Sequence, residues 1–515
     1  MFESTDTTPW YRSRQTLIGA GVCCAALLLA LFYHFYGYRY FSDRDAHYAE
    51  LERHRAQQAA LNAGGGQSQA PAAPGQTTAT TAPAENANAA QVPGGQTGAT
   101  DGANPTAATT AGQDANHPSA PAAATASSSS RNYWTNFRGP NRDGRYEERA
   151  VKTNWPAGGL KPMWKQPVGG GFSSFVVADG TAYTIEQRRA QEVVAAYNVE
   201  TGRELWTHGW NAAFSPDNTG DGPRSTPTWD AGRIYALGAE GELRALDAKS
   251  GKLYWQKNIL SDNGASNLQW GMAASPLIVD DKVVVLAGGT AGKGVVAYNK
   301  TTGTRVWSAL NDRASYTSPM LVTLAGKRQI LVVTASHVAG LDPGDGAVLW
   351  SHPWDVSYGI NVSQPLVVGA NRFLMSAGYG KGAALVELAG GGRSFTAKPV
   401  WENINLKTKF NSPVVAGGYA YGLDEGILTC IDLATGERKW KGGRYGYGQV
   451  LFAGNHLIVT TDAGEVALVK ADPSSYTEVS KFAALSGKTW NVPALANGRL
   501  LVRNGTEMAA YNLAE

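Results

Sequence analysis

The chain has 515 residues, of which 61 are Gly, 15 are Trp, 22 are Tyr and only 3 are Cys. Three cysteines cannot build a disulfide-rich secreted scaffold, and a net charge of +3 gives no broad basic footprint for nucleic acid. Charged residues make up 17% of the chain against a usual ~25%, so the composition favours a turn-rich β protein.

The first predicted element is an apolar segment within residues 15–40, uncharged as far as Tyr38 and followed by tyrosines. It is long enough to span a bilayer, which takes about 20 apolar residues, and interfacial tyrosines are typical of such spans. We expect a transmembrane signal anchor here, with residues 1–14 in the cytoplasm. A cleaved signal peptide is the alternative, although no small-residue cleavage site follows the segment. A lipid anchor would use Cys23 or Cys24, whose preceding residues suit lipidation poorly.

Two polar segments come next. Residues 41–58 are predicted to form a short polar helix that continues the span. Residues 59–130 consist of Ala, Gly, Thr, Pro, Gln, Asn and Ser, and they contain almost no large apolar side chains. Such a segment cannot bury enough surface to offset the entropy of ordering it, so a disordered linker is expected. Its typical reach of about 45–50 Å would let a following domain move well away from a membrane.

Residues 131–515 carry a sequence repeat of roughly 40–50 residues. Each unit has an alternating apolar strand, an Asp or Asn, usually a Thr-Gly or Ser-Gly pair, and then a Trp. The acidic or amide side chain and the glycine favour a tight turn, and the indole offers a large face for burial between units. We therefore assign a structural docking role to seven tryptophans, which are Trp164, Trp206, Trp255, Trp307, Trp350, Trp401 and Trp440.

A second landmark precedes each unit, usually a Ser, Thr, Gln or Asn followed by Pro, and it opens a short two-stranded hairpin. Each unit thus supplies four strands, which is one propeller blade. The units add up to eight blades, and the last one lacks its Trp strand. The early strand that contains Trp164 is predicted to complete it and to close the ring, which leaves no open sheet edge. The expected fold is a monomeric, all-β, eight-bladed β-propeller.

This repeat resembles the Trp-docking repeat of PQQ-like propellers, a superfamily that includes quinoprotein alcohol dehydrogenases and non-enzymatic BamB-like outer-membrane assembly factors. The segment Asn132–Tyr146 is also similar to the lead-in of BamB-like proteins with this repeat. The resemblance implies the fold more firmly than it implies a function.

The dehydrogenase resemblance would imply PQQ with a Ca²⁺ or lanthanide ion held by Glu, Asn and Asp, a catalytic Asp, and a disulfide between adjacent cysteines. The propeller contains a single cysteine, Cys430, which the strand pattern places in the core. Asp424 and Glu425 resemble a paired acid site, although their segment also fits an ordinary hairpin turn. The four histidines of the propeller are far apart in sequence and do not have the spacing of metal ligands. The sequence therefore predicts no catalytic residue, no metal and no cofactor. The alternative is that PQQ binds together with Ca²⁺.

Aromatic and basic residues recur at one point of each blade, where the outer strand connects to the next inner strand. They are expected to form a ring at one mouth of the central channel, either as a binding surface or as a plug. The ring comprises Arg224, Trp270, Arg313, Tyr316, Tyr358, Lys409, Phe410, Arg444, Tyr445, Tyr447, Lys488 and Trp490. Aromatic residues and Arg dominate interface energetics, so a peptide or partner loop suits this ring, as would an anionic ligand such as PQQ or a saccharide.

The function expected from the sequence is that of a BamB-like, non-enzymatic scaffold. It would be anchored in the inner membrane by a single span, display its propeller in the periplasm and bind envelope proteins. The alternatives are a PQQ-dependent dehydrogenase and a binder of sugars or cell wall.

Overall fold

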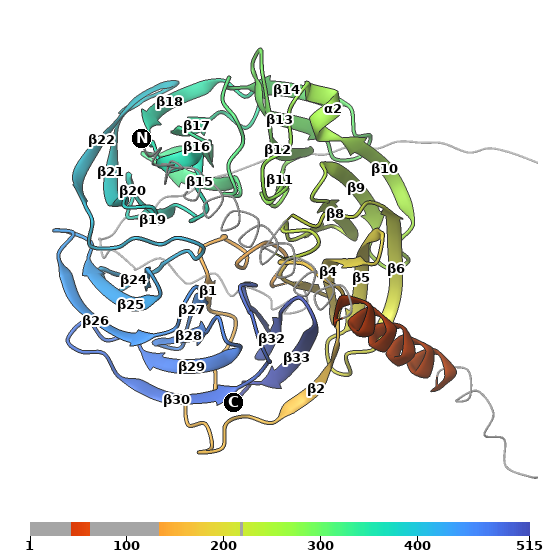
Figure 1. The fold of residues 1–515 in the computed structure, drawn as a ribbon. Helices are drawn as coiled ribbons and strands as arrows, with labels where there is room; N and C mark the ends of the chain where they lie inside the picture. The colour runs from red at the N-terminus through yellow and green to blue at the C-terminus, as the bar shows by residue number, and fades with distance from the viewer. Residues whose placement is uncertain (1–42, 62–132, 217–219) are drawn as a thin grey trace, which may run out of the picture. The chain divides into compact units, whose positions relative to one another are not determined.

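The computed structural model describes residues 43–61, 133–216 and 220–515. Eight antiparallel four-stranded sheets surround a central channel, and one of them has an additional short strand (Figure 1). The predicted all-β, eight-bladed propeller is therefore confirmed. We number the blades 1 to 8 in chain order, starting at β3.

The strands of blades 1 to 4 run from the channel outward, with a short helix, α2, after blade 2. They are β3 (Val176–Ala178), β4 (Thr181–Arg188), β5 (Gln191–Asn198) and β6 (Glu204–Asn211); β7 (Thr228–Asp230), β8 (Arg233–Leu237), β9 (Glu242–Asp247) and β10 (Leu253–Asn258), then α2 (Ile259–Asn263); β11 (Leu277–Val279), β12 (Lys282–Gly289), β13 (Lys293–Asn299) and β14 (Arg305–Ala309); β15 (Met320–Leu324), β16 (Lys327–Val333), β17 (His337–Leu341) and β18 (Val348–Pro353).

Blades 5 to 8 follow after a 3-10 turn, η1 (Ser357–Gly359). Their strands are β19 (Leu366–Val368), β20 (Arg372–Ala377), β21 (Gly382–Gly391) and β22 (Ser394–Asn403); β23 (Val414–Ala416), β24 (Tyr419–Asp424), β25 (Ile427–Asp432) and β26 (Arg438–Arg444); β27 (Gln449–Ala453), β28 (His456–Thr460), β29 (Glu465–Lys470) and β30 (Glu478–Ala483); β31 (Ala494–Ala496), β32 (Arg499–Arg503) and β33 (Glu507–Asn512), completed by β2 (Pro162–Pro167).

The ring closes as the sequence predicts. Strand β2 pairs antiparallel with β33, and Trp164 lies opposite Ala510. The last blade therefore combines both ends of the propeller sequence. Because the outer strand of blade 8 comes from the start of the domain, the two ends hold each other in place and no blade is left incomplete.

The repeat residues join neighbouring blades. The Trp206 indole donates to the Ala248 carbonyl of the next blade at 3.0 Å. Gly251 in that turn has a φ of +71°, and a Cβ there would lie 2.5 Å from the Trp206 ring. The Asp247 carboxylate accepts from backbone amides of the same turn. The equivalent indole-to-carbonyl bond to the next blade is made by Trp164, Trp255, Trp307, Trp401 and Trp440.

Blade 4 departs from this rule because blade 5 has a different hairpin. Strands β21 and β22 are ten residues long and meet at a Gly-rich turn that lacks the repeat's acidic residue. The Trp350 indole donates instead to the Gln329 side chain of its own blade, at 2.6 Å, and its ring lies 5.3 Å from that of Phe373. Trp350 thus packs between blades 4 and 5 without the usual carbonyl.

A helix occupies residues 43–61, so the predicted polar helix extends to residue 61 rather than residue 58. The predicted anchor at residues 15–40 and nearly all of the predicted linker lie outside the described residues. Within the described part of the chain, no helix combines the length and apolar character that a membrane span requires.

Candidate functional site

The landmark residues of blades 1 to 6 form a hydrogen-bonded series around the channel. In each case the backbone amide of one landmark residue donates to the side chain of its counterpart in the next blade. Distances are 2.7–3.0 Å for the successive pairs Ser174–Thr226, Thr226–Ser275, Ser275–Ser318, Ser318–Gln364 and Gln364–Ser412. These hydroxyl and amide groups are engaged in holding the inner strands together, which explains why the repeat keeps a small polar residue before Pro.

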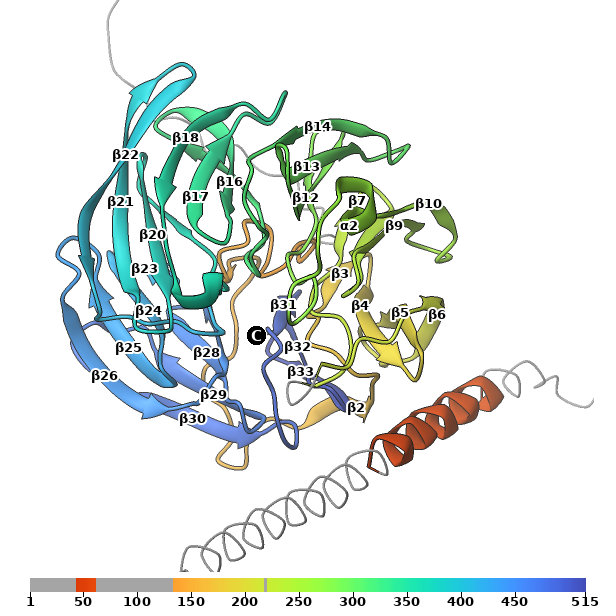
Figure 2. The same cartoon turned by 45° about the horizontal axis from the view of Figure 1, so that its top comes forward.

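The lead-in segment passes through this channel. Its short strand β1 (Arg145–Tyr146) pairs in parallel with β27, the inner strand of blade 7. Trp134 is fully buried, and its carbonyl accepts from the amide of Val177 in β3. Figure 2 shows this orange segment in the middle of the ring of blades. No role beyond the family resemblance was predicted for this segment, and in the structure it is an internal plug.

Two buried arginines attach the plug to the blades. The Arg142 guanidinium donates to the carbonyls of Ser275, Pro276 and Pro319, and only 2% of its surface is exposed. Arg138, with no exposed surface, donates to the Pro413 carbonyl at 2.9 Å. Burial lowers the pKa of Arg142 to about 9 and that of Arg138 to about 10. Each cation is thus solvated by peptide dipoles in place of water.

A cavity of about 230 Å³ lies on the plug, with Phe137 of the lead-in among its lining residues. Half of its lining residues follow one positional rule, which is that each of seven blades contributes the residue two positions before its landmark. These residues are Phe172, Arg224, Ala273, Tyr316, Val362, Phe410 and Trp490. Blade 7 places Tyr447 at the same position, where it packs against Phe410. The channel is therefore a funnel that is closed below and lined mainly by apolar and aromatic side chains.

Four aromatic rings pack together on one side of this funnel. The rings of Phe410 and Trp490 are stacked with centroids 5.1 Å apart. Phe172 lies 6.0 Å from Trp490, and Tyr447 meets Phe410 edge to face at 5.2 Å. Across the cavity, Trp270 pairs with Tyr316 at 5.8 Å. These rings pack on one another, as the plug alternative expects, and still leave a cavity.

Three cations lie on the aromatic faces. The Lys488 ammonium lies 3.8 Å from the Trp490 ring centroid, and burial together with nearby Arg224 lowers the pKa of Lys488. The Arg224 guanidinium lies 5.1 Å from the Phe172 ring, and it also donates to the Gly220 carbonyl. Lys409 lies 5.2 Å from Phe410. This arrangement combines π faces with positive charge and favours a partner that offers apolar or aromatic groups beside an anion.

The other predicted ring members do not line this cavity. Arg313, Tyr358 and Arg444 are exposed, and Tyr358 has 84% of its surface accessible. The prediction for Tyr445 is wrong, because only 2% of it is exposed and its hydroxyl bonds to Tyr476 and Glu478 at the outer strand. Gly443 and Gly446, on either side of it, have positive φ, a backbone conformation that the local sequence pattern did not lead us to expect.

Sequence reasoning missed Phe172 and Phe137. Phe172 stands two residues before Ser174, so the rule that locates Phe410 and Trp490 would have found it. Phe137 had no such signal, because it belongs to the plug, whose place in the channel depends on contacts with distant strands.

The residues considered for catalysis have structural surroundings. Cys430 is a free, buried thiol whose pKa burial raises to about 12. Asp424 is 1% exposed and is paired with Lys441 and Lys407. No cluster of three or more His, Cys, Asp or Glu side chains suited to a metal occurs in the described part of the chain. The residues lining the cavity include no Asp or Glu, so their chemistry does not fit the metal-bound quinone that the dehydrogenase resemblance would imply.

One titratable group lies buried between blades 1 and 2. Glu192 has no exposed surface, and its carboxyl accepts from the Ala239 amide at 2.9 Å. Burial raises the pKa of Glu192 from 4.5 to about 7. The folded state therefore holds this proton more tightly than the unfolded state, and its contribution to stability is lost as the pH rises from about 4.5 to about 7.

We expect Glu192→Gln to remove this pH dependence. The free energy of unfolding of the variant minus that of the wild type should therefore be about 2–3 kcal/mol larger at pH 8 than at pH 5. Urea denaturation at both pH values measures the difference. Glu437→Gln, at an exposed position, is the matched control and should show a constant difference. An equal pH response in both variants would contradict the assignment.

The fold and the site define an eight-bladed β-propeller with a Trp-docked ring and a funnel that an internal segment closes. The family model described as "Outer membrane protein assembly factor BamB" matches residues 189–442. This match and the relatives described below support a relationship of the chain to the β-propellers of the PQQ-like superfamily.

The similar proteins fall into two groups. BamB from Yersinia pestis is 25% identical over 256 residues, which cover 47% of this chain and 60% of that protein. BamB from Burkholderia pseudomallei is 24% identical over 59% of this chain and 75% of that protein. The 1-butanol dehydrogenase (cytochrome c) of Thauera butanivorans is 28% identical over 25% of this chain and 19% of that enzyme. The matches to the Yersinia protein and to the dehydrogenase thus span less than two thirds of those proteins.

The solved structure of BamB from Moraxella catarrhalis has the same fold. It superposes with a TM-score of 0.50 at 17% identity and covers 68% of this chain and 97% of that one.

Proposed function

We propose that this protein is a non-enzymatic scaffold that binds another protein at the mouth of its funnel. The observation that carries the proposal is the aromatic cavity above the plug, with Arg224, Lys409 and Lys488 on its ring faces. Trp, Tyr and Arg are the residue types that supply most binding energy at protein interfaces. The cavity of about 230 Å³ is smaller than the ~300–1,000 Å³ typical of small-molecule sites, and it suits one or two side chains of a partner segment.

The BamB relatives support an envelope role. Their name, outer membrane protein assembly factor, assigns them to the assembly of outer-membrane proteins. By this analogy the partner is a protein of the bacterial envelope, and the propeller acts in the periplasm. We include in the proposal that residues 15–40 anchor the chain in the inner membrane as a single span.

A quinoprotein dehydrogenase is the second candidate, and it is favoured only by partial matches to such enzymes. The lining of the cavity argues against it, since the described wall offers no carboxylate to hold a divalent or trivalent cation. Calorimetric titration of the full-length protein with PQQ and Ca²⁺ tests this candidate directly.

The scaffold proposal is tested by affinity capture. Full-length protein with a C-terminal tag is cross-linked in the membranes of its own organism and purified, and the partners are identified by mass spectrometry. We expect one or a few envelope proteins in stoichiometric amounts and no heat of PQQ binding. Saturable PQQ binding with dye-linked alcohol oxidation, and no captured protein, would overturn the proposal.

A further inference from the structure

The helix at residues 43–61 packs against blade 1. Tyr48 and Leu51 are 4% and 3% exposed, and they lie three residues apart, on one face of the helix. The Arg189 guanidinium of the β4–β5 turn lies 5.9 Å from the Tyr48 ring and donates to the Glu52 carboxylate at 2.6 Å. The two large apolar side chains in the first half of this mostly polar helix are thus used for docking.

Polar contacts extend this docking along the helix. Arg55 binds both carboxylate oxygens of Glu204, at 2.8–3.1 Å. Gln58 donates to the Gln166 side chain at 3.2 Å and accepts from the Glu204 amide at 3.3 Å. A bidentate arginine–carboxylate pair is more specific in geometry than a single surface ion pair.

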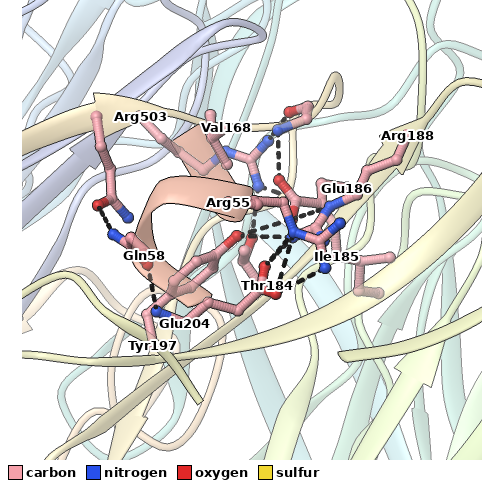
Figure 3. A network of polar contacts seen from close by, with 12 residues as sticks. Arg55, Gln58, Val168, Thr184, Ile185, Glu186, Arg188, Tyr197, Glu204 and Arg503 are labelled. Atoms are coloured by element: carbon pink, nitrogen blue, oxygen red, sulfur yellow. Dashed lines mark hydrogen bonds and ion pairs between the residues drawn. The ribbon is translucent and has the colours of Figure 1, made fainter. Parts of the chain in front are cut away.

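The surface that receives Arg55 is held in place by a buried network (Figure 3). Arg188 donates to Glu204 at 2.6 Å and to the fully buried Glu186 at 2.9 Å. Tyr197 also donates to Glu186, at 2.8 Å. Burial opposes ionisation of Glu186, but Arg188 and Arg503 lower the pKa of its carboxyl. Glu204 is therefore fixed by propeller residues, and Arg55 meets a carboxylate that needs little further ordering.

We infer that residues 43–61 form a latch that stays docked on blade 1 of the propeller. The helix before residues 62–132 and Trp134 after them are then both bound to the propeller. The reach of about 45–50 Å expected from the sequence would not separate the propeller from its anchor. The latch itself does not depend on the proposed function. The position of blade 1 does rest on that proposal, because blade 1 would lie beside the bilayer if residues 15–40 are in a membrane.

Hydrogen–deuterium exchange of the full-length protein in detergent tests the latch. Isolated helices of this length are only partly formed in water, because most helical stability in proteins comes from tertiary packing. We therefore expect protected amides across residues 46–58 in the wild type. Arg55→Ala and Leu51→Asp should each accelerate their exchange at least about tenfold and leave the exchange of the blade strands unchanged.

Arg53→Ala is the matched control, because Arg53 is exposed and donates only to the Ala49 carbonyl of its own helix. It should leave the exchange unaltered. Unprotected amides in the wild type, or equal protection in all variants, would overturn the latch. Neither result bears on partner capture, so failure of the latch and failure of the scaffold proposal are distinguishable.

Discussion

Arg142→Ala is expected to lower the free energy of unfolding of the propeller by about 3–5 kcal/mol. The guanidinium donates to the carbonyls of Ser275, Pro276 and Pro319, which belong to blades 3 and 4. Alanine would leave these acceptors without their donor in a region closed to water, and each unsatisfied buried group costs about 1–3 kcal/mol. Urea denaturation monitored by tryptophan fluorescence measures the loss.

Two further variants separate the buried bonds from the positive charge. Arg149→Ala removes an exposed arginine of the same segment, one that donates to the Asn497 side chain, and should change stability by less than about 0.5 kcal/mol. Arg142→Lys retains the charge but cannot reach the same acceptors from one planar group, so it should recover less than half of the loss. If Arg142→Ala were as stable as Arg149→Ala, the plug would not be a structural element of the ring.

Trp490→Ala is expected to weaken binding of the captured partner by at least about 30-fold, or ~2 kcal/mol. Trp490 lies at the centre of the aromatic wall, against Phe410 and Phe172, and carries Lys488 on its face. Removing it deletes the indole that stacks on Phe410 and holds the Lys488 ammonium on its face. Biolayer interferometry with the purified partner measures the change in Kd.

Trp490→Phe keeps an aromatic ring against Phe410 and should retain most of the affinity. Tyr358→Ala removes an exposed tyrosine that does not line the cavity, and it should change Kd less than threefold. If Tyr358→Ala and Trp490→Ala were equally harmful, or if neither had an effect, the cavity would not be the anchor of the interface.

The repeat allowed the blade count and the closure of the ring to be predicted, because the signals involved are local. The turn with Asp247 and Gly251 is made within a few residues, and the Trp206 docking position follows from the same unit in the next blade. The funnel ring was predictable in part for the same reason, since Phe410 and Trp490 have a fixed offset from the inner strand.

The plug and the latch depend on contacts that no local pattern encodes. Arg142 lies in a Gly- and Asn-containing segment that has the composition of an exposed loop, and its burial depends on carbonyls more than 130 residues away. Likewise, Arg55 and Glu204 are separated by 149 residues. Tyr445 shows a different kind of error. Its segment was correctly placed at the connection between blades 6 and 7, but its side chain points to Glu478 of the outer strand β30 and not to the funnel.

Site-specific photo-cross-linking in cells tests the central claim most directly. A photoreactive amino acid replaces Tyr358 in the full-length protein, or Lys249 in the β9–β10 turn, which joins the strand ends away from the funnel mouth. The scaffold account predicts a discrete adduct with an envelope protein from position 358, its loss in the Trp490→Ala background, and none from position 249. An adduct formed only from position 249, or one from position 358 that Trp490→Ala leaves undiminished, would contradict the account.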